Sequence, residues 1–261
     1  DLLLAHLAWP IAAGASVLHV FLDDPEDPAA EPAAALPGVR VIRCDARFWA
    51  AHPSGRRPDL IVARQTFCAT RAYRDPGADW LLHLDADEFL FQRSPLSREL
   101  ARNAGHAGAI VIPVRERALT GPDQQHLFEG PFRVPQQGAA RRAHPLLAPL
   151  SDLAPAGVIG HSLGKSVTRA GLDVALHPHF PRPAGGGQPS EVPRLPSQSS
   201  VLLHFDGLTP LHWLAKMLRR VPVMPTAPEG YLGAHRRAQL RLVAACGHDP
   251  ARLMAVHDRL R

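Results

Sequence analysis

A short apolar run, W-L-L-H-L at residues 80–84, leads directly into carboxylates at Asp85, Asp87 and Glu88. The apolar residues at 89 and 90 then return the chain to a core. An apolar run of this length is typical of a buried strand. Carboxylates grouped beside a core are costly to bury unless a cation compensates their charge. The sequence therefore predicts a strand whose carboxyl end is a candidate cation site.

Strand and helix patterns alternate along the rest of the chain. We expect further strands at 16–22, 39–43, 109–114 and 200–205. We expect helices at 2–13, at 58–74 with Asp59 as its cap, from 94 onwards, at 210–220 and near the C-terminus. This alternation predicts an α/β fold with a mainly parallel sheet flanked by helices. Such sheets bind ligands at the carboxyl ends of their strands, where Asp23 and Asp85 are both expected.

The size and composition of the chain indicate a packed globular protein. It has 261 residues, of which 46% are hydrophobic and 20% are charged. We expect one main domain at 1–225 and a helical extension at 226–261. The net charge of +5 is modest and the arginine pairs are scattered along the chain. This charge is compatible with anionic ligands and argues against a nucleic-acid binder.

The cysteines Cys44, Cys68 and Cys246 are far apart and show no C-x-x-C spacing. This pattern argues against a disulfide scaffold or a zinc knuckle and fits a reducing compartment, so we expect a cytoplasmic protein. No apolar stretch approaches the roughly 20 residues of a membrane span. We therefore expect no spanning helix, while peripheral association with a membrane is compatible with the sequence.

The spacing of Asp85 and Asp87 suggests a specific chemistry. Mg²⁺ and Mn²⁺ prefer oxygen ligands, and carboxylates at i and i+2 of a strand end can divide two tasks. One ligates the cation, while the other reaches a ribose or a metal-bound water. A cation held in this way stabilises the negative charge that grows on a leaving diphosphate. A D-x-D pattern alone is also typical of a solvated turn, and the preceding strand favours a site here.

The segment W-x-x-x-x-D-x-D-E-F at 80–89 resembles that of bacterial family-2-like glycosyltransferases, which have the GT-A fold. Further similar segments follow in the order of that group: R-Q at 64–65, G-K-S at 164–166, H-P-H at 177–179 and H-F-D-G at 204–207. The resemblance spans roughly residues 15–220 and implies a GT-A-like catalytic domain at 1–225. The group's first strand, with its N-E element, is absent ahead of Asp1. We therefore expect a truncated N-terminus or incomplete donor binding.

The resemblance implies a set of metal ligands. Asp87 is the main ligand, Asp85 is its partner towards the ribose or a metal-bound water, and His204 completes the shell. An imidazole ligand suits Mn²⁺ better than Mg²⁺, and a buried core histidine is the alternative for His204. We expect Asp87 and His204 to converge on one cation in the folded chain.

The remaining site residues are also implied by the resemblance. Asp23 is expected near the nucleobase, and Arg64 and Gln65 on the preceding helix are expected to contact the donor. Lys165 is expected to hold the donor diphosphate or an acidic acceptor, with an exposed loop lysine as the alternative.

The proton of the acceptor requires a base in an inverting transfer. Glu116 and Asp206 are the candidate catalytic residues for this task, and a structural salt bridge is the alternative for each.

These residues together predict a metal-dependent, hexosyltransferase-like glycosyltransferase. The expected donor is a nucleotide-sugar, with a UDP-sugar favoured, and the expected acceptor is a saccharide or glycolipid of bacterial polysaccharide biosynthesis. One alternative is an α/β-hydrolase that uses Ser162, because G-H-S-L-G at 160–164 matches the G-x-S-x-G nucleophile elbow. A second alternative is a sugar-nucleotide-binding module without catalytic activity.

Overall fold

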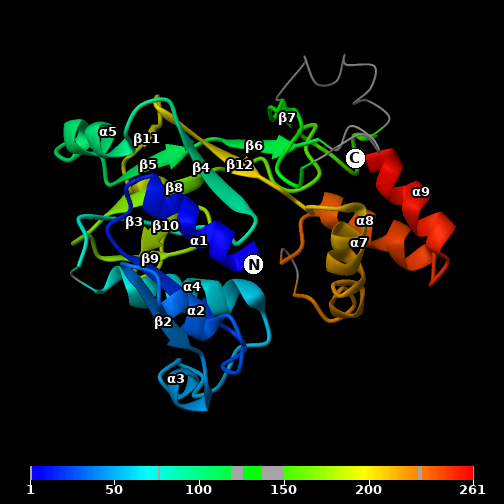
Figure 1. The fold of residues 1–261 in the computed structure, drawn as a ribbon, viewed down its shortest axis with the longest axis horizontal. Helices are drawn as coiled ribbons and strands as arrows, with labels where there is room; N and C mark the ends of the chain where they lie inside the picture. Colours follow the sequence, from blue (N-terminus) through cyan, green and yellow to red (C-terminus); the bar gives the residue numbers. More distant parts are fainter. Residues whose placement is uncertain (1, 76, 119–125, 137–149, 229–230, 261) are drawn as a thin grey trace. The chain divides into compact units, whose positions relative to one another are not determined.

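The computed structural model describes residues 2–75, 77–118, 126–136, 150–228 and 231–260 (Figure 1). The chain forms two compact units, each built from two segments. Unit 1 comprises Asp1–Pro113 and Leu163–Leu202, and unit 2 comprises Val114–Ser162 and Leu203–Arg261. The expected boundary at 225 follows a different division of the chain and stays a prediction.

Unit 1 begins with α1 (Leu2–Ala12), β1 (Leu18–Leu22), α2 (Ala30–Ala34) and β2 (Val39–Arg43). Strands β1 and β2 pair in parallel along their whole length. Val20 and Leu22 of β1 are buried against Leu7 of α1 and Ala33 of α2, so the alternating apolar residues of β1 cover one face of the pair. Asp23 follows β1 directly, as predicted for a strand end.

The central sheet of unit 1 has the strand order β11-β5-β8-β3. Its strands are β3 (Trp80–Leu82), β5 (Ala109–Ile112), β8 (Lys165–Arg169) and β11 (Arg194–Pro196). Strand β8 runs antiparallel to both β3 and β5, whereas β11 runs parallel to β5. The prediction of a mainly parallel sheet is therefore wrong, and the sheets are mixed. The reason is that residues 155–164, which lead into β8, form no crossover helix, and an antiparallel neighbour needs none.

The other elements of unit 1 surround this sheet. They are α3 (Ala46–Ala50), α4 (Ile61–Tyr73), β4 (Glu88–Gln92), α5 (Leu96–Asn103), β9 (Val174–Leu176), β10 (Pro181–Pro183) and the first part of β12 (Ser200–His204). Tyr73 of α4 is buried among the apolar residues of β9, and its hydroxyl donates to the carbonyl of Arg169 at 2.6 Å. Helix α4 has Leu60 at its N-cap without a side-chain hydrogen bond, so the predicted cap at Asp59 is wrong.

Unit 2 contains β6 (Val114–Arg117), β7 (Phe132–Arg133), α7 (Pro210–Leu218), α8 (Ala234–Ala245) and α9 (Pro250–Leu260). The three helices, gold to red in Figure 1, enclose a core in which Trp213, Met217, Leu240 and Val243 have no exposed surface. Thr209 caps α7 by accepting from the backbone amide of His212. Strands β6 and β7 pair in the antiparallel direction, with Glu116 opposite Arg133.

The structure contains both helices and mixed sheets, which agrees with the α/β class predicted from the sequence, but helices and strands alternate only in the part from α1 to β5. The strand predicted at 39–43 coincides with β2, and the helix predicted at 210–220 contains α7. Among the described residues, no helix has the length and apolar character that crossing a membrane requires.

A buried carboxylate, Glu99 of α5, organises the loop that enters β12. Its oxygens accept from the hydroxyl of Ser197 at 2.8 Å, from the amide of Gln198 at 2.7 Å, and from the hydroxyl and amide of Ser199. Burial by itself would raise the pKa of Glu99, but these hydrogen bonds outweigh it and lower the pKa. The ionised carboxylate is therefore the form that stabilises the loop.

We predict that Glu99→Gln lowers the free energy of unfolding at pH 7 by about 1–3 kcal/mol, because it removes charge-assisted bonds in a buried site. The folded-state pKa of Glu99 is depressed, so its stabilisation is present above the unfolded pKa of about 4.3 and is lost as the pH falls through the folded value. Urea unfolding of both proteins between pH 7 and pH 3 measures this difference. A difference that grows towards acid pH would contradict the assignment.

Candidate metal centre

The acidic segment forms a tight turn between β3 and β4. The amide of Glu88 donates to the carbonyl of Asp85 at 3.0 Å, and the amide of Asp85 donates to Oε2 of Glu88 at 2.8 Å. These reciprocal bonds close the turn through both backbone and side chain. Glu88 has no exposed surface, whereas Asp87 is half-buried. The return to the core at Phe89 agrees with the prediction, whereas the strand before the turn is shorter than the predicted 80–84 and is half-buried.

Lys165, the first residue of β8, reaches into this turn. Its side chain is completely buried, and its ammonium lies 2.9 Å from Oδ2 of Asp85 and 3.1 Å from Oε2 of Glu88. The amide nitrogen of Gln65 donates to Oδ1 of Asp85 at 2.5 Å. Burial opposes the charge of Lys165, but Asp85 and Glu88 outweigh it and raise the pKa of the ammonium. The alternative of a lysine exposed on a loop is therefore excluded.

A neighbour that the sequence pattern did not reveal is His6 of α1. Its ring is buried and contacts Phe89 edge-on, with 5.2 Å between the ring centroids. Burial lowers the pKa of His6, and the charges of Asp87, Glu88 and Asp85 act against this shift. A histidine in an apolar helix carries no local signal for such a position, and its contacts with the turn come only from the packing of α1 against β4.

His204 ends strand β12 and is almost completely buried. Its Nδ1 lies 3.6 Å from Oε2 of Glu116, and its ring stacks on that of His161 with 5.0 Å between the centroids. Glu116 in turn accepts the backbone amides of Ile159 and Gly160, each at 2.6 Å. Glu116 therefore connects strand β6, the loop at 159–160 and the imidazole.

The close packing of Glu116 and His204 leaves room only for a glycine at position 160. A Cβ atom at Gly160 would lie 2.7 Å from Oε2 of Glu116 and 2.7 Å from Cε1 of His204. The carbonyl of Gly160 also lies 2.9 Å from Nε2 of His235. The glycine that begins the G-H-S-L-G segment thus has a packing role beside His204.

Asp206 lies two residues after His204 and is also buried. The ammonium of Lys216 on α7 donates to Oδ1 of Asp206 at 2.7 Å, and Arg236 on α8 lies 3.5 Å from Oδ2. Gly207 follows with φ +100, and a Cβ atom there would lie 2.6 Å from Cβ of Trp213. The H-F-D-G pattern therefore requires its glycine for a sharp turn onto α7.

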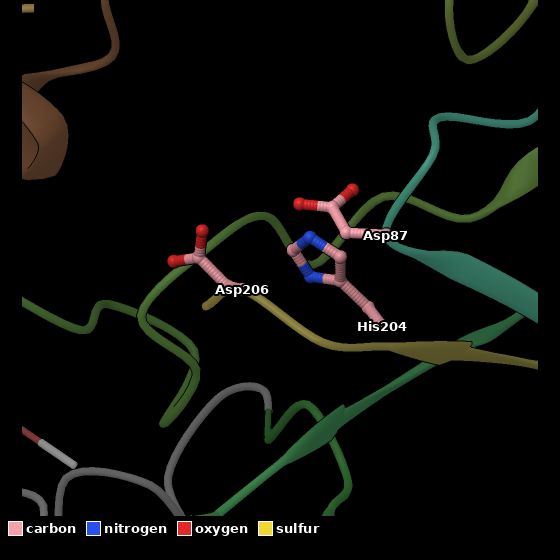
Figure 2. A group of neighbouring side chains, drawn as sticks. All are labelled: Asp87, His204 and Asp206. Carbon is pink, nitrogen blue, oxygen red and sulfur yellow. The ribbon is translucent and has the colours of Figure 1, made fainter. Parts of the chain in front are cut away.

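Asp87, His204 and Asp206 form the group of potential metal ligands found among the described residues (Figure 2). One ligand atom from each lies within 4.8 Å of the others. Asp87 directly precedes β4, and His204 ends β12.

The predicted site residues fall into separate groups. Asp85 belongs with Lys165 and Gln65 rather than with the ligand group, and Asp206, predicted as a base, belongs with it. Asp23 is paired with Arg57 and lies 3.3 Å from the guanidinium of Arg64. The predicted roles of these residues towards a donor stay predictions.

The hydrolase alternative lacks its structural context. A nucleophile elbow needs a strand before the serine and a helix after it. Residues 155–164 around Ser162 contain no strand, and the strand β8 follows at Lys165 instead of a helix. The G-H-S-L-G segment is therefore a loop with an exposed serine, and it does not form an elbow.

We predict that Gly160→Ala destabilises the protein by about 1–3 kcal/mol, the usual cost of overpacking, because the added methyl group displaces Glu116 or His204. Thermal unfolding measures the loss, and the imidazole NMR signal of His204 should shift. Gly105→Ala is the matched control, since a Cβ atom at Gly105 meets nothing within 4 Å. Equal effects of the two substitutions would show that Gly160 has no special packing role.

The chain matches no protein-family model, no curated protein and no solved structure.

Proposed function

We propose that the chain is a metal-dependent glycosyltransferase of the GT-A type that takes its sugar from a nucleotide-sugar, with UDP as the favoured nucleotide. The observation that carries this proposal is the grouping of Asp87, His204 and Asp206. Two carboxylates and an imidazole form a donor set suited to Mn²⁺. When bound, such a cation supplies charge stabilisation for a leaving diphosphate.

The charges around the ligand group support an anionic substrate. Asp87, Asp206 and nearby Glu116 carry the negative charges, and Lys216 and Arg236 carry the positive ones. These five side chains sum to one net negative charge, which a divalent cation would compensate. In the proposed complex, Lys216 and Arg236 would bind phosphate oxygens by charge-assisted hydrogen bonds.

The contacts of Glu116 and Asp206 also concern the choice of a catalytic base. Both oxygens of Glu116 accept backbone amides, so its lone pairs are directed into the loop at 159–160. Asp206 is one of the potential ligands. Glu116 and Asp206 stay as predicted base candidates, but these contacts favour a positioning role for Glu116 and a ligand role for Asp206.

We predict that UDP binding depends on Mn²⁺ and that Asp87→Asn weakens it by about 100-fold or more, since even the loss of an outer-shell partner costs about 10- to 100-fold in metal affinity. Calorimetric titration with UDP, with Mn²⁺ and with EDTA, measures the effect. Asp173→Asn, an exposed carboxylate of unit 1, is the control and should bind as the wild type does.

The outcomes separate the competing functions. Unchanged metal-dependent binding in Asp87→Asn would refute the metal centre. Hydrolysis of nucleotide-sugars from a panel would support a transferase, whereas binding without any turnover would favour a binding module. Ester hydrolysis that Ser162→Ala abolishes, without nucleotide binding, would favour a hydrolase.

We predict that Lys216→Met lowers the affinity for UDP about tenfold or more and leaves the affinity for uridine unchanged, because the ammonium would contact phosphate and not the nucleoside. Titration with both ligands in the presence of Mn²⁺ measures the two affinities. A parallel loss of uridine binding would mean that Lys216 acts through the fold of α7 and not through phosphate.

A further inference from the structure

We propose that Lys165, Asp85 and Glu88 form a buried ionic clamp that positions Asp87, and that Asp85 is part of this clamp and not a ligand of the cation. This inference rests on the proposed function, because it assigns Asp87 the cation. The clamp is defined by the bonds of the Lys165 ammonium to Asp85 at 2.9 Å and to Glu88 at 3.1 Å. Lys165 and Glu88 are completely buried.

The clamp controls the backbone that carries Asp87. Asp87 is the third residue of the turn from Asp85 to Glu88, and the amides of the two end residues are bonded within the turn. The carboxylate of Glu88 that accepts from Asp85 also accepts from Lys165. Movement of the ammonium would therefore open the turn and change the direction in which Asp87 leaves it.

The hydrogen bonds that Asp85 accepts argue against its being a ligand of the cation. Gln65 donates to Oδ1 and Lys165 donates to Oδ2, so both oxygens of Asp85 have protein donors. A cation bound at about 2.1 Å from Oδ2 would lie within about 5 Å of the Lys165 ammonium, given the bond of 2.9 Å. Two like charges at that distance in a buried site repel strongly.

The position of Lys165 is fixed by the sheet. It is the first residue of β8 and stands opposite Ile112 of β5. A Cβ atom at the preceding Gly164 would lie 2.0 Å from the carbonyl oxygen of Ile112, so only glycine permits this approach. The G-K-S segment, predicted to contact a diphosphate, thus delivers the ammonium into the acidic turn.

The test asks whether a second substitution, added to Lys165→Met, raises or lowers the affinity for Mn²⁺. Lys165→Met should weaken Mn²⁺ binding by about 10- to 100-fold, the usual cost of losing a group that positions a ligand, because the buried carboxylate of Glu88 and the half-buried carboxylate of Asp85 then repel each other. Adding Asp85→Asn to Lys165→Met removes one of these charges, so the double variant should bind Mn²⁺ more tightly than Lys165→Met and unfold at a higher temperature. A ligand role for Asp85 requires the opposite, a further loss of affinity.

The second double variant, Lys165→Met/Glu88→Gln, keeps the net charge of the wild-type clamp and should also be more stable than Lys165→Met. It provides a folded protein if Lys165→Met does not fold. Glu99→Gln is the control, since it removes another buried carboxylate of unit 1 and should lower stability without changing Mn²⁺ affinity. A loss of Mn²⁺ affinity in this control would overturn the clamp as a specific positioning device.

Electron paramagnetic resonance of free Mn²⁺ measures the affinities directly. If Lys165→Met binds Mn²⁺ as tightly as the wild type or more tightly, or if adding Asp85→Asn weakens binding further, the clamp proposal is overturned while the metal centre stands. If the wild type binds no Mn²⁺, or if Asp87→Asn binds it equally well, the proposed function is overturned together with the positioning of Asp87.

Discussion

The buried ammonium of Lys165 is the interaction on which the acidic turn and its surroundings depend. A lysine without exposed surface requires carboxylates beside it, and buried carboxylates in turn require a cation. Lys165 and its partners Asp85 and Glu88 meet this requirement for one another. Because Lys165 also begins β8, which pairs with both β3 and β5, the same contact joins the central sheet of unit 1 to the turn after β3.

The parts of the fold that local patterns determine could be predicted from the sequence. Strand β2 at Val39–Arg43 and helix α7 at Pro210–Leu218 were accessible because their apolar periodicity and their end signals lie within a few residues. The direction of β8 was not, because no pattern in β8 states that it pairs with β5 across more than 50 positions and with β3 across more than 80. Such pairing is decided by the path of the whole chain.

In the candidate site, too, local patterns predicted some features, whereas others depend on residues far away in the sequence. The D-x-D-E-F pattern located the acidic turn and predicted Asp87 as the main ligand, but it also directed Asp85 towards the cation, the ribose or a metal-bound water. The difference between these two carboxylates comes from Gln65 and Lys165, which lie 20 and 80 positions away from Asp85. His6 was missed for a similar reason. Asp206 is two residues from His204, yet a salt bridge or a base was as compatible with its sequence as a place beside the imidazole.

The surroundings of His204 include a buried carboxylate, which the proposed ligand role would use. A histidine that only fills space needs no carboxylate beside its ring, because burying that carboxylate is costly. Here Glu116 is completely buried, and two backbone amides hold it 3.6 Å from Nδ1 of His204. In many metal centres, a carboxylate that accepts a hydrogen bond from the far nitrogen of a ligating imidazole orients the ring. Glu116 lies on the Nδ1 side of the ring at 3.6 Å, and Gly160 provides the space in which the carboxylate and the ring approach each other.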